Sequence, residues 1–458
     1  MSQNREQWGS KLGFILAASG SAVGIGNIWK YPSMAGQNGG GAFTLVYLAC
    51  ILVVGLSIVI AEFVIGRKTQ LSPVGAFEKL APGTNWKWVG YLGVASAFVI
   101  LSFYGVVGGW ILKYIIDSFS GGFDALAGNP EAAGTMFNGF ITSAWSPVIY
   151  QVLFMALCIW VIVNGVKGGI EKWSKVMMPL IVILLGRLAI RGMTLPGGME
   201  GLSFLFNPRF EDLTASAIVL ALGHSFFTVS LGMGTMITYG SYLDKKQNLL
   251  NSALWVIFLD TAIAMLAGVA IFTTVFALGA NPAEGPGLIF VVLPTVFAQM
   301  AGGAIWSTMF FILLFMAALT SAISILEVVT AYFIDQKGWS RKKATIQFGA
   351  VITIVGAFCS FSLGGGINIT EFMGMPFMDF MDYLSSKYML PIGGMLTAIF
   401  VLKKWGVSNY LVELKNGMEG KNVSPQLVKA ILTIAAAVVA FILFNEVYAK
   451  IFGKALIG

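Results

Sequence analysis

Long apolar stretches recur from residue 12 almost to the end of this chain, and they constrain its fold more than any other feature. A helix needs about 20 mainly apolar residues to cross roughly 30 Å of hydrocarbon. Only 11% of the residues are charged, so many stretches are long enough to span a bilayer. We therefore predict an all-α polytopic membrane protein that forms a single domain over residues 1–458, with the stretch 117–146 as a long external loop. The eleven predicted spans are 12–35, 42–66, 88–116, 147–164, 176–194, 214–242, 247–278, 293–334, 345–363, 374–402 and 427–449.

Basic residues predict the orientation of the chain, because cytoplasmic loops retain Lys and Arg. With a cytoplasmic N-terminus, about twenty of the 28 Lys and Arg residues fall on the cytoplasmic side. The net charge of +7 then reflects topology and attraction to anionic membrane lipid. No basic run is interleaved with exposed aromatics, so we expect no nucleic-acid partner. Cys50, Cys158 and Cys359 fall inside spans without metal-like spacing, which argues against disulfides and zinc.

Glycine pairs interrupt two predicted spans near their middle: Gly24-Ile25-Gly26 in the first and Gly232-Met233-Gly234 in the sixth. Glycine weakens a helix by about 1 kcal/mol relative to alanine, although small residues also permit close helix packing. Each break lies in the first member of a run of five spans. This pattern is typical of an inverted-repeat transporter with a binding site at the bilayer midplane. We predict repeats at 12–194 and 214–402, followed by an additional helix at 427–449.

A small set of polar residues falls inside the predicted spans. Ionisable groups there cost about 2.5 to 3.5 kcal/mol unless paired, which makes them functional candidates. Helical hydroxyls such as those of Thr320 and Ser321 often only bond a carbonyl one turn earlier. Alternatively, hydroxyls and freed carbonyls offer oxygen ligands for Na⁺, and the N–H groups of a half-helix receive a substrate carboxylate. The set comprises Asn27, Glu62, His224, Thr228, Ser230, Asp260, Thr320, Ser321, Glu327, Asp379 and Asp382.

Several motifs resemble the neurotransmitter:sodium symporter family, and together they cover essentially the whole chain. The resemblance is strongest to the bacterial eleven-span branch, which includes transporters of hydrophobic amino acids and of tyrosine. It implies a leucine-transporter-type fold, a 5+5 inverted repeat with helices 1 and 6 broken plus an eleventh helix, in the bacterial inner membrane. The motifs are Arg5-Glu6-x-Trp8-Gly9-Ser10, Gly20-Ser21-Ala22-Val23-Gly24-Ile25-Gly26-Asn27, Glu62-Phe63-x-x-Gly66-Arg67, Phe226-Phe227-Thr228-Val229-Ser230-Leu231-Gly232-Met233-Gly234 and Ala317-Ala318-Leu319-Thr320-Ser321.

The resemblance implies two bound Na⁺ ions and one amino-acid substrate. Asp260 stands where many members have Asn, 32 positions after Thr228. Its carboxylate would supply the negative charge that chloride provides in animal relatives, so no chloride is expected. The first Na⁺ is implied at Ala22, Asn27, Thr228, Asp260 and the substrate carboxylate, and the second at Gly20, Val23, Ala317, Thr320 and Ser321. The implied substrate pocket comprises Ala22, Ile25, Gly26, Ile100, Tyr104, Val107, Phe227, Ser230, Met233, Ser321 and Ile325.

The wall of the implied pocket is apolar and has no acidic residue to pair a cationic side chain, which favours neutral hydrophobic L-amino acids. A flexible methionine, Met233, suits side chains of several sizes, so we expect both aliphatic and aromatic substrates. By the resemblance, Tyr104 bonds the substrate carboxylate and Phe227 forms a lid.

The resemblance also implies two gates that open in alternation. Lys30 pairs with Asp382 on the outside, and Arg5 pairs with Asp335 on the inside. Lys30 replaces the usual arginine and lacks its bidentate fork, so we expect this outer pair to be looser or water-bridged. Three further residues are implied to support the inner gate: Trp8, Ser241 and Tyr242.

Two other positions carry implied roles. A family motif linked to unwinding of the fifth span is matched by Gly169, nine intervening residues and Pro179. The unwinding lets cytoplasmic water reach the second Na⁺. His224, the only histidine, replaces a glutamine that lies beside the chloride site of animal members. A packing role is favoured for His224 over a pH response.

Other functions are compatible with parts of this pattern. An enzyme is not expected, because the chain lacks H-E-x-x-H and G-x-S-x-G motifs and adjacent residues such as His224 and Ser225 do not face each other on a helix. A non-transporting amino-acid sensor would show the same binding residues. A proton-coupled symporter could use Glu62, His224 and Asp260. Both alternatives stay open, and so does assembly into a homo-oligomer.

Overall fold

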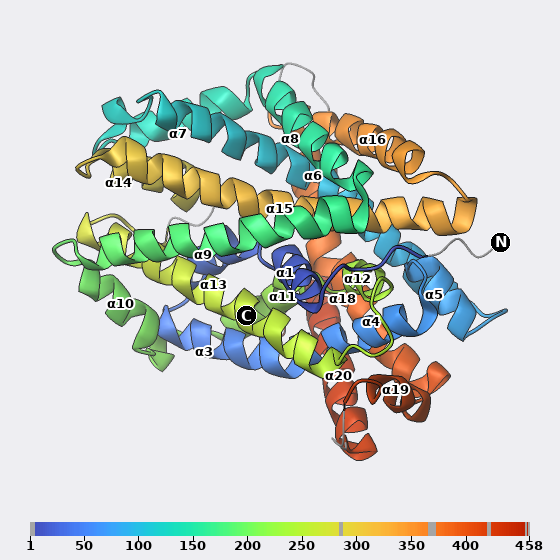
Figure 1. The fold of residues 1–458 in the computed structure, drawn as a ribbon. Coiled ribbons are helices and arrows are strands. Elements are labelled where there is room, and N and C mark those ends of the chain that lie inside the picture. Colours follow the sequence, from blue (N-terminus) through green and yellow to red (C-terminus); the bar gives the residue numbers. More distant parts are fainter. Residues whose placement is uncertain (1–4, 284–286, 365–371, 419–422, 454–455, 457–458) are drawn as a thin grey trace.

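The computed structural model describes residues 5–283, 287–364, 372–418, 423–453 and 456, and these residues are almost entirely helical (Figure 1). Within them, nine helices are long and apolar enough to cross a membrane. The prediction of a polytopic helical protein is therefore confirmed. The nine spans are Gly41–Thr69 (α3, η2, α4), Lys87–Phe119 (α6), Ser146–Val163 (α8), Val166–Met193 (η4, α9), Leu249–Ala277 (α13), Gly303–Lys337 (α15), Arg341–Phe361 (α16), Phe377–Trp405 (α17, η7, α18, η8) and Pro425–Phe452 (α20).

The first predicted span is broken where its glycines predict. Helix α1 (Lys11–Ala22) is followed by Gly26–Gln37 (η1 and α2), and the two parts are bent by 51°. Between them, Val23 has an extended backbone with ψ of 103°. The carbonyls at the end of α1 and the amides before η1 are thereby left outside the regular helical ladder.

The sixth predicted span is also broken, and it forms α11 (Ala215–Thr228) and α12 (Thr235–Gly240). The φ angles of Ser230, Gly232 and Gly234 are 53°, 77° and 77°. At Gly232 only glycine fits, because an added Cβ would lie 2.2 Å from the Leu390 carbonyl oxygen. The freed amide of Gly232 donates to Glu62 Oε1 at 2.9 Å. Glu62, one of the polar residues inside the predicted spans, therefore has a structural role: it satisfies the backbone of the break.

Three predictions about spans and loops are wrong. The span predicted at 176–194 begins at Val166, because η4 continues directly into α9. The span predicted at 293–334 begins at Gly303, because Leu288–Ala298 (η6 and α14) forms a separate short helix and Gly302 turns the chain with a φ of 73°. The predicted loop 117–146 contains α7 (Pro130–Ile141), whose first turn is capped by the Asn129 side chain accepting from Ala132 N. The remaining short helices are α5 (Pro73–Leu80), η3 (Asp124–Leu126), α10 (Gly198–Phe206), η5 (Phe210–Asp212) and α19 (Val407–Leu414).

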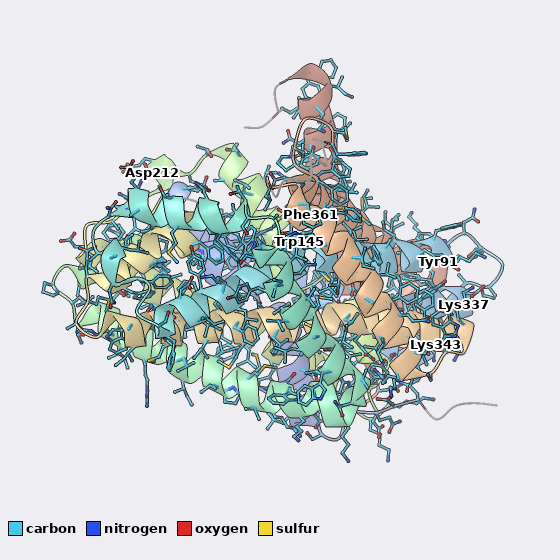
Figure 2. All side chains as sticks on the ribbon, turned by 90° about the horizontal axis from the view of Figure 1, so that it is seen from above. Tyr91, Trp145, Asp212, Lys337, Lys343 and Phe361 are labelled. Atoms are coloured by element: carbon cyan, nitrogen blue, oxygen red, sulfur yellow. The ribbon has the colours of Figure 1, made fainter. Side chains whose placement is uncertain are left out.

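Several basic residues lie together at one end of the helix bundle. Figure 2 shows Lys337 and Lys343 near Tyr91 at one end and Asp212 at the other. The N-terminal segment also lies at the lysine end (Figure 1), where Arg5 contacts Asp335. We call this end, defined by Arg5, Lys337 and Lys343, the basic end.

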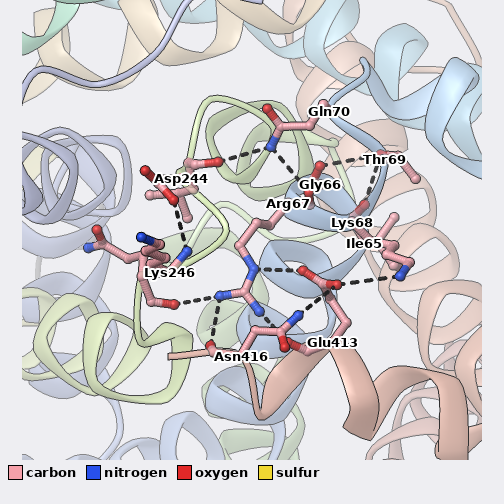
Figure 3. Close-up of polar contacts among 12 residues, drawn as sticks. Ile65, Gly66, Arg67, Lys68, Thr69, Gln70, Asp244, Lys246, Glu413 and Asn416 are labelled. Carbon is pink, nitrogen blue, oxygen red and sulfur yellow. Dashed lines mark hydrogen bonds and ion pairs between the residues drawn. The ribbon is translucent and has the colours of Figure 1, made fainter. Parts of the chain in front are cut away.

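A buried arginine fixes the basic end of α4 (Figure 3). Arg67 has no exposed surface, and its Nε donates to Glu413 Oε1 at 2.8 Å. Its Nη1 donates to the carbonyl oxygens of Gln247 at 2.5 Å and Asn416 at 3.1 Å. Arg67 thus joins α4, the segment before α13 and the end of α19 at one point. The polar groups of this buried cluster are paired, as their burial requires.

Candidate functional site

A cavity lies where the two broken spans face α6 and α15. The cavity is small, about 20 Å³, which is room for about one water molecule. Of the predicted pocket residues, Ile25 and Val107 are buried nearby but do not line the cavity. Ser21, Gly24 and Thr228 line it in addition. The full lining is Ser21, Ala22, Gly24, Gly26, Ile100, Tyr104, Phe227, Thr228, Ser230, Met233, Ser321 and Ile325.

The phenol of Tyr104 points at the break in the first span. Its Oη accepts a long hydrogen bond of 3.4 Å from the amide of Ile25. An added Cβ on Gly24 would lie 2.5 Å from Ser321 Oγ and 3.0 Å from Tyr104 Oη, so Gly24 gives these hydroxyls access to the break. One end of the cavity is therefore polar, with backbone amides beside two hydroxyl groups. Such an arrangement can receive a carboxylate.

Asn27, Thr228 and Asp260 come together between the two breaks and α13. Asn27 Nδ2 donates to Asp260 Oδ1 at 2.7 Å, and Thr228 Oγ1 donates to the same oxygen at 3.2 Å. Asn27 Oδ1 accepts from Gly24 N at 3.0 Å. All three side chains are buried. The structure therefore brings together the polar side chains of the first predicted Na⁺ group, next to Ala22.

Among the residues that the structure describes, no cationic side chain pairs with the carboxylate of Asp260. None of the ion pairs formed by the described residues includes it. A buried charge is costly unless it is paired. A small cation held by oxygen atoms would supply the missing charge. The described part of the chain contains no cluster of three His, Cys, Asp or Glu residues, so it offers no transition-metal site of that kind.

The second predicted Na⁺ group lies where α15 contacts the end of α1. Ser321 Oγ donates toward the carbonyl oxygens of Ser21 at 3.2 Å and Val23 at 3.3 Å. Thr320 Oγ1 bonds carbonyls of its own helix, at 3.0 Å for Ala317 and 3.1 Å for Met316, as the structural interpretation predicts. An added Cβ on Gly20 would lie 3.2 Å from Thr320 Cβ, so all five predicted residues are neighbours. The carbonyls that end a half-helix are electronegative and suit a cation.

A direct ion pair closes the end away from the basic end. Lys30 Nζ lies 3.1 Å from Asp382 Oδ1 and 3.4 Å from Oδ2. It also lies 4.2 Å from the ring centroid of Phe227, which lines the cavity. The pair is direct and not water-bridged, because the ammonium reaches both carboxylate oxygens and also contacts the Phe227 ring. That the pair is looser than one formed by arginine stays a prediction.

A second closure lies at the basic end. Arg5 forms an ion pair with Asp335 and donates to Ser241 Oγ at 2.6 Å. Its guanidinium lies 4.6 Å from the ring centroid of Tyr242. The amide of Trp8 donates to the Tyr242 carbonyl at 3.2 Å. The five predicted residues thus form one cluster, and both closures are present at once.

Sequence reasoning missed a buried ion pair beside this cluster. Arg341 donates to both carboxylate oxygens of Glu327, at 2.7 and 3.0 Å, and to Glu6 at 2.8 Å. Tyr242 also donates to Glu327, at 2.5 Å. Glu327 stood out as an acid inside a span, but its partner is the first residue of the next span, α16, and no local pattern pairs the two.

His224 packs against Tyr47, with ring centroids 5.3 Å apart. Within the described residues, neither imidazole nitrogen has a hydrogen-bond partner. Its position is consistent with the packing role that the sequence favours.

Comparisons with known proteins agree with this geometry. The model of the sodium:neurotransmitter symporter family matches residues 5–125 and 141–453. The chain is 41% identical over 416 residues to the sodium-dependent transporter YhdH of Bacillus subtilis, which covers 91% of each chain. It is 36% identical over 409 residues to a sodium-dependent transporter of Haemophilus influenzae, covering 87% of this chain and 89% of the relative.

A solved structure supports the same assignment. The structure of MhsT in complex with L-phenylalanine superimposes with a TM-score of 0.88 and 47% identity, covering 96% of this chain and 99% of that one. The broken first and sixth spans described above are features of the leucine-transporter type of fold. The chain therefore belongs to the sodium:neurotransmitter symporter family.

Proposed function

We propose that this transporter imports neutral hydrophobic L-amino acids, aliphatic and aromatic, together with Na⁺ and without chloride. The observation that carries the proposal is the cavity between the two broken spans. Its polar end presents the amides of the first break and the hydroxyl of Tyr104, which suit a carboxylate. Its other residues include Ile100, Met233 and Ile325, and none of the described residues that line it is acidic. An uncharged apolar side chain fits that wall best.

Sodium coupling is proposed at two positions. The oxygens of Asn27, Thr228 and Asp260 would hold one Na⁺ beside the substrate carboxylate. Among the described residues, the Asp260 carboxylate forms no ion pair with a cationic side chain. The hydroxyls of Thr320 and Ser321 would hold the other against the end of α1. The negative charge of Asp260 makes an additional anion unnecessary for neutralising the first ion. Binding of each cation would draw together elements from both predicted repeats, 12–194 and 214–402.

Alternating access would use the two closures. We propose that the basic end is cytoplasmic, because Lys and Arg are retained there. Opening of the Lys30–Asp382 pair would admit substrate and Na⁺ from outside. Opening of the Arg5–Asp335 pair would release them inside. The chain would act in the bacterial inner membrane. MhsT, whose solved complex contains L-phenylalanine, supports an amino-acid substrate.

Proteoliposomes test the proposal. An imposed Na⁺ gradient, with pH clamped, is expected to concentrate radiolabelled phenylalanine and leucine, whereas a K⁺ gradient is not. Unlabelled tryptophan is expected to compete, and lysine and glutamate are not. Replacement of chloride by gluconate is expected to leave uptake unchanged.

Uptake driven equally well by a proton gradient in K⁺ would favour the proton-coupled alternative. Sodium-dependent binding without counterflow would favour the sensor.

A further inference from the structure

The N-terminal segment and the start of the fifth span hold each other through two carboxylates. Val166 N, the first amide of η4 (Val166–Glu171), donates to Glu6 Oε2 at 2.7 Å. In return, Glu171 at the end of η4 accepts from Gly9 N at 2.6 Å and from Ser10 Oγ at 2.9 Å. We call these five residues the carboxylate clamp. It joins the entry to α1 with the first turn of the fifth span.

Glu171 is built into this contact rather than resting on the surface. Its side chain is 2% exposed, and Lys175 Nζ lies 2.6 Å from its Oε1. An added Cβ on Gly13 would lie 2.1 Å from the same oxygen, so the carboxylate occupies the space that a side chain at residue 13 would need. The carboxylate also lies at the N-terminus of α1, where the helix dipole favours negative charge.

Helices α1 and α9 (Lys172–Met193) pack in register above the clamp. Gly13 faces Glu171, and Gly20 faces Met178, where an added Cβ would lie 3.3 Å from the Met178 sulfur. Each pair is separated from the next by seven residues, or about 10.5 Å of helix. Gly20 belongs to the second proposed Na⁺ group. The same two helices therefore form the polar contact at the basic end and a contact at that group.

The clamp depends on the π-helical turn of η4. Gly169 in this turn has no room for a side chain, because an added Cβ would lie 2.0 Å from the Val161 carbonyl oxygen. A hollow of about 690 Å³, lined by Gly9, Lys167, Gly168, Glu171, Lys172 and Lys175, opens beside the clamp. If η4 unwinds, Glu171 leaves Gly9 and Ser10, and solvent in this hollow can replace it.

We propose that Glu171 is a positioning residue for transport: it couples unwinding of η4 to release of α1, and so controls when the second Na⁺ group opens to the cytoplasm. The inference rests on the proposed function, because it assumes that Na⁺ is released at this end. Glu171 belongs neither to the cavity lining nor to either proposed Na⁺ group. It acts through α1, whose last residues supply carbonyl ligands.

Cysteine labelling tests the coupling. Ser174 is buried on α9, on the same helical face as Glu171 and Met178. We would introduce Ser174→Cys into a background that lacks Cys50, Cys158 and Cys359. Inside-out vesicles in Na⁺ would be treated with a membrane-impermeant methanethiosulfonate reagent. Glu171→Gln keeps the size of the side chain but loses its charge and one acceptor, so the labelling rate is expected to rise about tenfold.

Matched variants separate coupling from general damage. Glu78→Gln, at an exposed acid of α5, is expected to label like the parent. Glu6→Gln, at the half-exposed partner of Val166, is expected to raise labelling in the same direction and provides the test if Glu171→Gln does not fold. The inference would be overturned if the parent binds phenylalanine in a sodium-dependent way but neither Glu171→Gln nor Glu6→Gln changes the labelling rate. Failure of the parent itself to bind phenylalanine in Na⁺ would instead overturn the proposed function.

Discussion

Asp260→Asn is expected to weaken Na⁺ binding strongly while leaving the fold intact. Asparagine has nearly the same shape, and its oxygen can still accept from Asn27 Nδ2, which lies 2.7 Å from Asp260 Oδ1. The change therefore removes a charge and little else. A cation that contacts the oxygens of Asn27 and Thr228 would lie within about 4 Å of the carboxylate, since Thr228 Oγ1 is 3.2 Å from Oδ1.

The magnitude follows from Coulomb's law. Two unit charges at about 4 Å attract by about 4 kcal/mol at an effective dielectric constant of 20. Asp260 has no exposed surface, so solvent screening does not reduce this value much. Because about 1.4 kcal/mol corresponds to a factor of ten, Na⁺ affinity is expected to fall by a factor on the order of 1,000.

The assay is binding of radiolabelled phenylalanine to purified protein across a Na⁺ titration. Each titration would be run in chloride and in gluconate. Chloride is expected to restore part of the affinity of Asp260→Asn and to leave the parent unchanged, because an added anion can replace the missing charge. The exposed Asp124→Asn serves as the control. A half-saturating Na⁺ concentration within threefold of the parent would refute the electrostatic argument.

Three further substitutions test other parts of the structure. Thr320→Ala is expected to raise the half-saturating Na⁺ concentration at least about tenfold in the same titration, because an oxygen ligand of the cation is lost. An unchanged titration would mean that the Thr320 hydroxyl only bonds carbonyls of its own helix and does not bind Na⁺. Tyr104→Phe is expected to weaken phenylalanine binding about tenfold at saturating Na⁺, with unaltered thermal stability in detergent. Equal affinity would mean that the Tyr104 hydroxyl does not bind the substrate carboxylate. Arg67→Met is expected to destabilise the protein by about 3 kcal/mol, because Glu413 stays buried and keeps only the more distant Lys68 Nζ, at 3.6 Å, as a cationic partner. Thermal melting in detergent measures this loss, and the paired change Arg67→Met with Glu413→Leu is expected to recover part of it.

The helical breaks could be predicted from the sequence because glycine has a local effect. Gly24 and Gly232 weaken their helices whatever surrounds them, and both spans are in fact interrupted. Ser230 is different. Its positive φ of 53° is unusual for a residue other than glycine, and no local pattern predicts it. It is held there by its neighbours, including the hydrogen bond from its hydroxyl to the Ser21 carbonyl at 2.8 Å.

The errors of prediction arise where a pattern does not contain enough information. The segment from 288 to 298 is as apolar as the span that follows, so hydropathy cannot show that Gly302 separates them. Pairings over long sequence distances are likewise hidden. Glu327 could be recognised as an unusual acid in a span, yet nothing near it in sequence identifies Tyr242 as a partner. The carboxylate clamp is hidden for the same reason, because Glu6 and Val166 are far apart in the chain.

The close fit around the sixth-span break has a consequence for redesigning substrate choice. An added Cβ on Gly232 would strike the Leu390 carbonyl oxygen, and one on Gly234 would lie 2.5 Å from Pro73 Cγ. Met233 between them instead points its side chain into the cavity. The side chain at residue 233 can therefore be replaced, by engineering or natural variation, without changing the backbone, because its two neighbours fix the backbone on either side. A library at residue 233 would sample new substrates on an unchanged frame, whereas libraries at 232 or 234 would mostly sample unfolded protein.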